Sequence, residues 1–152
     1  MAYEPLYVAY LIYFNRDRDY FECHEVLEEL WLEQDRDPLY KALLQAAVGL
    51  YHFRNGNIRG AAIMLGGSGE RLAAYPPGTL GIRIDKLAAE CTNYARRLQR
   101  YETEPFAYED LTIEIMDPEL AAEVRRTAPG LAPNIPQRRG PQRPDKAKAK
   151  RT

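Results

Sequence analysis

The sequence predicts an all-α protein, a single compact bundle of about five helices followed by a disordered C-terminal tail. Apolar residues recur at spacings of three and four through most of the first hundred positions, and Asp-Pro, Asn-Gly and Pro-Pro-Gly signals punctuate them. No strand-rich region competes with this pattern. At 152 residues, of which 45% are hydrophobic, the chain is long enough to bury one core. We therefore expect one helical domain at residues 1–128.

The first two helices are marked by their start and stop signals. Pro5 suits a first helical turn, and the apolar run behind it reaches Phe14, where the polar run 15–18 interrupts it. Asp19 and Glu22 have the spacing of a capping box, and nothing breaks helical periodicity before residue 35. We expect a short first helix and a second helix at about 19–34.

The third and fourth helices flank an Asn-Gly-Asn turn. Asp37 before Pro38 predicts the start of the third helix, which runs to the turn at 55–57, where Gly56 or Asn55 takes the left-handed terminal conformation. The fourth begins near Asn57 and contains GGSGE, residues 66–70. Three glycines there weaken a helix, so we expect a weak, bent or close-packed segment rather than an anion-binding loop.

The rest of the chain is less regular. Asp85 is predicted to cap a fifth helix that reaches about Tyr101. Residues 103–116 alternate partly like a strand but have no evident partner, so we expect an extended arm. A last short helix is expected near residues 118–126. From residue 129 the chain is rich in proline and lysine or arginine, which predicts a disordered tail over 129–152.

Charge, the length of the apolar runs and cysteine spacing narrow the classes to which this protein is expected to belong. Residues 129–152 carry a charge of +6 and residues 1–128 a charge of −7, which together give the net charge of −1. The apolar runs are shorter than the ~20 residues of a membrane span, and the start has no basic region of a signal peptide. Cys23 and Cys91 lie in helical patterns without C-x-x-C spacing, which predicts two buried free thiols. We expect a soluble, unexported protein, cytoplasmic or, in a photosynthetic eukaryote, in the plastid stroma.

The stretch YFECHEVLEELW, residues 20–31, holds the main candidate site. On a helical wheel Cys23, His24, Leu27, Leu30 and Trp31 form the core side, whereas Glu22, Glu29 and Glu33 form a solvated stripe. Glu25 and Glu28 fall between apolar positions and should be partly buried. The third helix has a stripe of Lys41, Gln45, Val48 and His52, so Gln45 and His52 are predicted to supply donors to the two glutamates.

Three interpretations of this cluster stay open. The first is a hydrogen-bonded polar seam that fixes the register of two helices. The second is a divalent metal site of a hydrolase-like enzyme, built from His24, Glu25, Glu28 and His52, although the second histidine of H-E-x-x-H is missing. The third is a small-ligand or peptide pocket that uses Trp31, Tyr20 and the carboxylates.

The chain resembles a known family. The motif H-E-x-L-E-x-x-W within YFECHEVLEELW, together with Q-x-A-x-x-x-Y-H-x-x-x-G-N-x-x-G-A from Gln45, is similar to the family catalogued as domain of unknown function 309. The resemblance covers about residues 10–100. It implies a small helical bundle with tetratricopeptide-like hairpins, in bacteria, archaea and plastids, and no established activity. The family pattern falls on Tyr20, Phe21, Glu22, His24, Glu25, Leu27, Glu28, Trp31, Gln45, Tyr51, His52, Gly56, Asn57, Gly60 and Ala61.

These observations favour a helical binding or scaffold module with a polar cluster beside an aromatic groove. Its partner is expected to be another protein or a second copy of the chain, with no membrane. The alternative is the metal-dependent enzyme described above, and the residues do not decide between them. A weaker alternative is an RNA-associated protein that uses the basic residues between 138 and 151.

Overall fold

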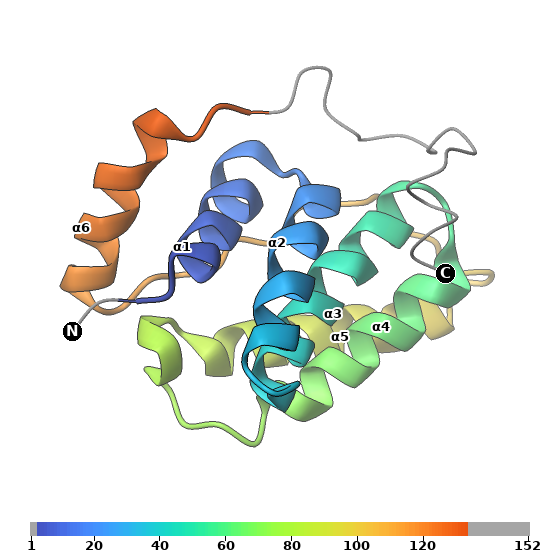
Figure 1. Ribbon diagram of the computed structural model, residues 1–152. Coiled ribbons are helices and arrows are strands. Elements are labelled where there is room, and N and C mark those ends of the chain that lie inside the picture. The colour runs from blue at the N-terminus through green and yellow to red at the C-terminus, as the bar shows by residue number, and fades with distance from the viewer. Residues whose placement is uncertain (1–2, 134–152) are drawn as a thin grey trace.

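The computed structural model describes residues 3–133, most of which lie in six α-helices (Figure 1). The predicted all-α class is confirmed, with a sixth helix at the position where a short one is expected. No β-strand occurs within residues 3–133, where Ile82 and Ile115 form an isolated bridge. The elements are α1 (Pro5–Ile12), η1 (Tyr13–Asp17), α2 (Tyr20–Glu33), α3 (Pro38–Arg54), α4 (Ile58–Leu72), η2 (Thr79–Gly81), α5 (Ile84–Gln99), α6 (Pro118–Thr127) and η3 (Ala128–Gly130).

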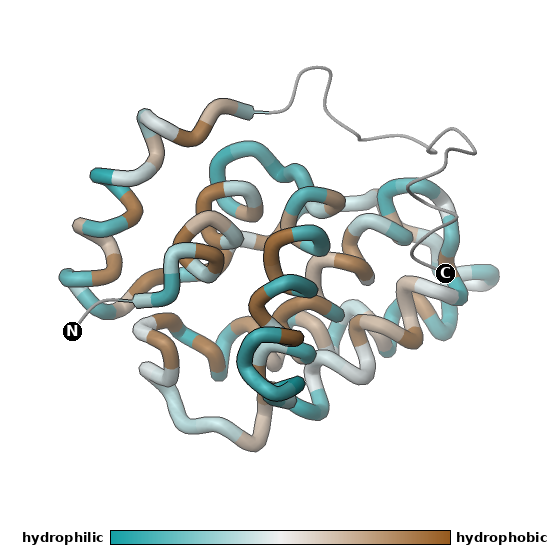
Figure 2. Tube along the Cα trace, in the orientation of Figure 1, coloured by the Kyte–Doolittle hydropathy of each residue, from teal (hydrophilic) through white to brown (hydrophobic). Residues whose placement is uncertain are grey.

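Helices that are neighbours in the chain pack against each other from α1 to α5, so α3 lies between α2 and α4. The segment after α5 runs back across the molecule to α6, which lies beside α1 at one edge (Figure 1). Hydrophobic and hydrophilic residues alternate along α2, and hydrophilic ones gather in the turn that follows it (Figure 2). Helix α2 therefore has one side toward the core and one toward solvent.

Three of the predicted helix starts are confirmed by their capping bonds. The side chains of Asp19, Asp37 and Asn57 accept hydrogen bonds from backbone N–H groups in the first turns of α2, α3 and α4, at 3.1, 2.9 and 3.0 Å. The turn glycine Gly56 has φ of +85°, the left-handed conformation that glycine adopts without strain. The short connections at these caps hold α2, α3 and α4 next to one another.

Two predicted helix ends are wrong. Residues Tyr13–Asp17 continue α1 as a π-helical turn instead of interrupting it, and the chain leaves the helix at Arg18, whose φ is +54°. Asp85 does not cap α5, which begins at Ile84. Its carboxylate pairs with the guanidinium of Arg83, with Oδ1 and Nε 3.2 Å apart, and this pairing lowers the pKa of Asp85. A carboxylate in the first turn of a helix favours the helix whether or not it caps it, and the sequence pattern is the same in both cases.

The glycines of α4 allow close packing, as expected. A Cβ at Gly69 would lie 2.3 Å from Thr92 Oγ1 on α5, and the hydroxyl of Ser68 donates to the carbonyl of Ala42 on α3 at 2.8 Å. The α4 backbone thus approaches both neighbours. Cys23 and Cys91 are free and buried, as predicted.

The C-terminal tail is only partly within the described residues. Arg16 donates hydrogen bonds to the carbonyls of Ala128 and Leu131, which fixes the chain up to that point against η1. Residues 134–152, with the basic positions 138–151, lie outside the described residues. None of the helices within residues 3–133 is long and apolar enough to cross a membrane.

Candidate functional site

Helix α2 divides the motif residues between two sides. Tyr20, Cys23, Leu27 and Leu30 are buried and form its core side. His24 and Trp31, predicted to lie on that side, are half-buried at its border instead. Glu25 and Glu28 are also half-buried, with 29% and 39% of their side chains exposed, in agreement with the predicted partial burial.

Glu22 differs from its predicted place on a solvated stripe. It is half-buried, whereas Glu29 and Glu33 are exposed as expected. The reason is the preceding π-helical turn, which brings Tyr13 close to the start of α2. Burial raises the pKa of Tyr13, and the nearby carboxylate of Glu22 raises it further.

Tyr20 is fully buried, which fits a structural role in the core and does not fit a place in an open groove. Its hydroxyl donates to Asp110 Oδ1 at 2.8 Å, and the hydroxyl of Tyr108 donates to the same oxygen at 2.6 Å. Burial raises the pKa of Tyr20; hydrogen bonding with Tyr108 lowers it and the bond to Asp110 raises it. The guanidinium of Arg54 lies over the Tyr20 ring, 4.7 Å from its centroid. Tyr20 thus joins α2 to the end of α3 and to the extended arm.

Helix α3 is buried except along one stripe. Between residues 39 and 53, the residues that are not buried are Lys41, Leu44, Val48, Tyr51 and His52, and Gln45 lies among them with 9% exposed. Their spacing of three and four places them within about a third of the helix circumference. The stripe is the single side on which this central helix meets solvent within the part of the chain described.

Helix α2 borders this stripe along its whole length. The ring centroids of Phe21 and Tyr51 lie 6.0 Å apart at one end, and Lys41 Nζ lies 4.8 Å from the Trp31 ring centroid at the other. These two contacts show that α2 and α3 are antiparallel, with His24, Glu25 and Glu28 on the stretch of α2 between them. The three polar residues therefore lie next to the α3 stripe.

Helix α4 borders the stripe on its other side. Arg71 Nη1 donates to Gln45 Oε1 at 2.9 Å, and Asn57 Nδ2 lies 3.3 Å from His52 Nδ1. A Cβ at Gly60 would approach Asn57 Nδ2 to 2.7 Å, so a glycine leaves room for the Asn57 side chain. These contacts of Gln45 and His52 point toward α4, and donation from these side chains to Glu25 and Glu28 stays a prediction.

Most of the remaining motif residues therefore gather on one partly exposed surface across three helices, which we call the motif face. We define it by Phe21, His24, Glu25, Glu28 and Trp31 of α2, by Lys41, Leu44, Gln45, Val48, Tyr51 and His52 of α3, and by Gly60, Met64, Gly67 and Arg71 of α4. Arg71 was missed by the sequence reasoning. Arg71 lies one turn after Gly67, which is beside Gln45, and no signal in the sequence places either of them against α3.

The carboxylates of the motif face lie on two sides of one histidine. Glu25 Oε2 lies 3.7 Å from Nδ1 of His24, and Glu28 Oε1 lies 3.9 Å from Nε2 of the same ring. The two nitrogens of an imidazole point away from each other, so these contacts do not converge on one point. Within residues 3–133, no group of three or more His, Cys, Asp or Glu side chains is arranged to hold a metal ion.

The charges of the motif face are separated across it. Helix α2 carries five glutamates and no lysine or arginine. Lys41 on α3 and Arg71 on α4 provide the cations of the face. The half-buried apolar side chains Leu44 and Val48 of α3 lie between α2 and α4. The face therefore has an acidic edge along α2, an apolar middle and the cation of Arg71 at its edge along α4.

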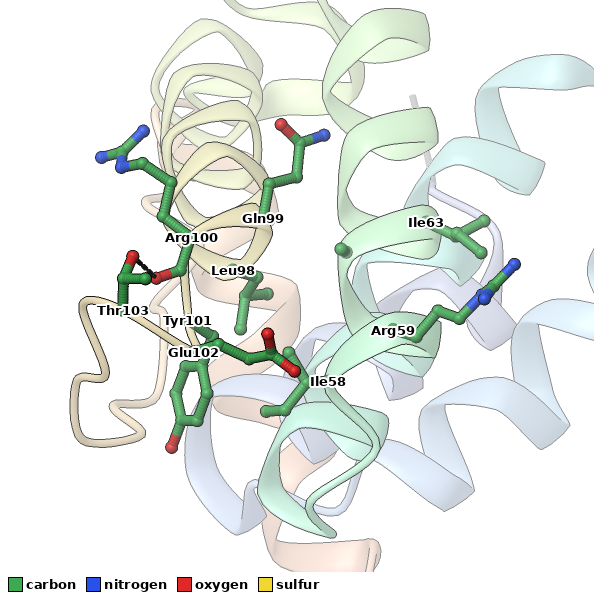
Figure 3. Close-up of a pocket in the computed structure, with 10 residues that line it drawn as sticks. Ile58, Arg59, Ile63, Leu98, Gln99, Arg100, Tyr101, Glu102 and Thr103 are labelled. Atoms are coloured by element: carbon green, nitrogen blue, oxygen red, sulfur yellow. Dashed lines mark hydrogen bonds between the residues drawn. The ribbon is translucent and has the colours of Figure 1, made fainter.

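A pocket of about 720 Å³ lies outside the motif face, between the start of α4, the end of α5 and the turn after it. Ile58 and Leu98 lie on its two sides, whereas the guanidinium groups of Arg59 and Arg100 point away from each other (Figure 3). The sequence reasoning did not identify this pocket, because its lining comes from segments 40 residues apart. No set of charged groups converges inside it.

Comparisons with known proteins agree with the resemblance noted in the sequence. Residues 7–64 match the model of a family described as a domain of unknown function (DUF309), a range that runs from within α1 to the middle of α4 and includes all the motif residues. An uncharacterized protein of Bacillus subtilis, YpuF, is 44% identical over 69 residues, which are 43% of this chain and 40% of that protein. An uncharacterized protein of Aquifex aeolicus is 28% identical over 74 residues, 47% of this chain and 22% of that protein.

The matched regions thus span less than half the length of both relatives, and no solved structure matches the chain. The match includes the H-E-x-L-E-x-x-W motif and the start of α4, so residues 7–64, less than half of this chain, are similar to the DUF309 family.

Proposed function

We propose that this chain is a helical protein-binding module that binds a segment of another polypeptide on the motif face. The observation that carries the proposal is the open stripe of α3. A central helix that is otherwise buried leaves this one stripe uncovered, and motif residues border it on both sides. Residues that are not needed for the core but share one surface are typical of a binding site.

The chemistry of the motif face indicates the class of segment. Glu25 and Glu28 favour lysine or arginine, whereas Leu44 and Val48 favour apolar side chains. Phe21 and Tyr51 add aromatic area of the kind that dominates protein interfaces. A basic amphipathic segment combines these features. The successive antiparallel packing of α2, α3 and α4 is also the basis on which we describe the hairpins as tetratricopeptide-like.

We place this binding activity in the cytoplasm. Cys23 and Cys91 are both free thiols, which fits a reducing compartment. Burial raises the pKa of Cys91 to about 12, so its thiol is unreactive at neutral pH.

Selection of peptides from a random display library tests the proposal. We expect wild-type protein to enrich peptides with basic and apolar residues. Their affinity should fall at least about tenfold for a Glu25→Lys, Glu28→Lys variant, since like charges then face each other. The matched control is Glu102→Lys, Glu104→Lys, which makes the same change in net charge at exposed positions outside the face. Its affinity should stay within about twofold of wild type.

Circular dichroism establishes that both variants keep their helices. The proposal is wrong if the selected peptides bind the face variant as tightly as the wild type. It is equally wrong if no peptide is enriched above the background of an unrelated helical protein.

A further inference from the structure

We propose that a second copy of this chain binds the motif face, so that two copies form a symmetric dimer with α2 of each against α4 of the other. This inference rests on the proposed function, because it names the partner of the same surface. Two observations carry the inference. They are the distribution of charge across the motif face and the positions of the charged residues along the α3 axis.

The first step is the charge of the two edges. On the motif face, α2 contributes Glu25 and Glu28 and no lysine or arginine, whereas α4 contributes Arg71. Two symmetric arrangements place one motif face on another. A two-fold axis across the helices would stack α2 on α2 and bring like charges together, whereas an axis parallel to α3 places α2 over α4. Electrostatic repulsion disfavours the first and attraction favours the second.

The second step is the position of the charged residues along the α3 axis. The Trp31 ring lies against Lys41. Because α2 is antiparallel to α3 and Glu28 comes three residues before Trp31, Glu28 lies level with Leu44 and Gln45 along the α3 axis. Arg71 also lies at that level, because its guanidinium bonds to Gln45. Glu28 and Arg71 are thus level with each other on opposite sides of α3. Rotation about an axis parallel to α3 places Glu28 of each copy over Arg71 of the other copy.

The third step concerns the apolar side chains. Among residues 3–133 the large hydrophobic side chains classed as exposed are Leu32, Ile63 and Met116, at 51%, 57% and 48%. Leu32 lies on α2 one turn after Glu28, at the α2 edge of the motif face, whereas Ile63 lines the pocket outside the face. Leu32, Leu44 and Val48 form apolar surface that the second copy would cover.

Sedimentation equilibrium of the full chain, with charge reversals, tests the dimer. We expect wild type to dimerise, and Glu28→Arg or Arg71→Glu alone to weaken the dimer at least about tenfold. The double reversal should restore dimerisation to within about threefold of wild type, because the attraction is then recreated with opposite signs. Arg71→Lys, which keeps the charge, serves as a control for the loss of the Gln45 bond.

Cysteine crosslinking tests which helices lie against each other in the dimer, independently of how tightly the two copies associate. A mixture of Glu28→Cys protein with Arg71→Cys protein should form a disulfide-linked heterodimer, whereas neither variant alone should crosslink to itself. Self-crosslinking of Glu28→Cys would overturn the proposal by placing α2 on α2. A maleimide–succinimidyl ester reagent that links the thiol of Glu28→Cys to a lysine between residues 146 and 150 of the same chain, in a monomer, would overturn it by assigning the face to the basic C-terminal segment.

A wild-type protein that stays monomeric at all concentrations also overturns the dimer. In that case peptides selected on the motif face would still support the proposed function. If no peptide binds but the crosslinked dimer forms, the proposed binding of other polypeptides is wrong and the proposed self-association is supported.

Discussion

Asn57 performs two tasks with one side chain. Its Oδ1 accepts the backbone N–H of Gly60 at 3.0 Å and so caps α4, while its Nδ2 lies 3.3 Å from His52 Nδ1. An amide nitrogen only donates, so Nδ1 of His52 is the acceptor in this contact and a neutral His52 carries its proton on Nε2. One asparagine thus begins a helix and orients a histidine on the motif face.

Substitution of Asn57 separates these tasks. Asn57→Ala removes the cap and should lower the free energy of unfolding by about 1 kcal/mol, measured by urea denaturation. Asn57→Asp keeps a capping oxygen but loses the amide donor to His52, so its stability should stay close to that of wild type. Equal losses in the two variants would contradict the capping role.

The glutamates of α2 are expected to contribute little to stability. They crowd one helix without a basic residue, so Glu25→Gln with Glu28→Gln should leave the free energy of unfolding within about 0.5 kcal/mol of wild type or increase it. Glu29→Gln with Glu33→Gln, at exposed positions of the same helix, provides the matched control. A loss of several kcal/mol confined to the first pair would show an essential ionic network instead of a binding surface.

At the scale of the element, the sequence predicts helices well where a capping residue and a proline or glycine mark their ends. Asp19, Asp37 and Asn57 are read correctly because their side chains make local bonds that depend on the adjacent residues alone. Asp85 is read wrongly because its partner, Arg83, competes for the same carboxylate. Which side of α3 faces α4 depends on contacts such as Gln45 with Arg71, and periodicity within one helix carries no information about them.

The glycines of α4 provide a test of close packing. Gly69→Ala should be destabilising by about 1 to 3 kcal/mol, because its Cβ would lie 2.3 Å from Thr92 Oγ1 and 3.1 Å from the carbonyl oxygen of Ala88. Gly66→Ala is the control in the same helix. Its Cβ would meet Ala95 at 3.6 Å, an ordinary contact, so higher helix propensity should stabilise it by up to about 1 kcal/mol. The same sign for both variants in chemical denaturation would refute this difference.

Helix α6 is tied to the start of the chain by a bond that depends on pH. The hydroxyl of Tyr3 donates to Asp117, which lowers the pKa of Asp117 and raises the pKa of Tyr3 to about 12. A lowered carboxyl pKa stabilises the fold above the unfolded value near 4, and this stability is lost as pH falls through the folded value. Tyr3→Phe should therefore lower the melting temperature at pH 7, and the difference from wild type should shrink at pH 3. A difference that is equal at both values would exclude this coupling.

At the scale of the whole molecule, the extended arm between α5 and α6 closes the fold. The sequence indicates an arm at 103–116 without a partner, because its partners are side chains far away in the chain. Tyr20 reaches Asp110, Arg18 reaches the carbonyl of Leu111, and Asn15 reaches Ile113. Rings of Phe53 and Phe106, with centroids 5.2 Å apart, fix the start of the arm on α3. Such contacts between distant segments define the fold but leave no periodic signal in the sequence.

Asn15 is the strongest test of this closure. Its Nδ2 donates to the carbonyl of Ile113 and its Oδ1 accepts the Ile113 N–H, both at 2.9 Å, as a neighbouring strand would. Ile113 is 2% exposed, so Asn15→Ala leaves two backbone groups without a partner and should lower the free energy of unfolding by about 2 to 4 kcal/mol. Thr112→Ala removes an exposed hydroxyl bonded to Arg18 in the same arm and should cost less than about 0.5 kcal/mol. If Asn15→Ala unfolds at the same urea concentration as Thr112→Ala, the arm does not hold the two halves of the chain together.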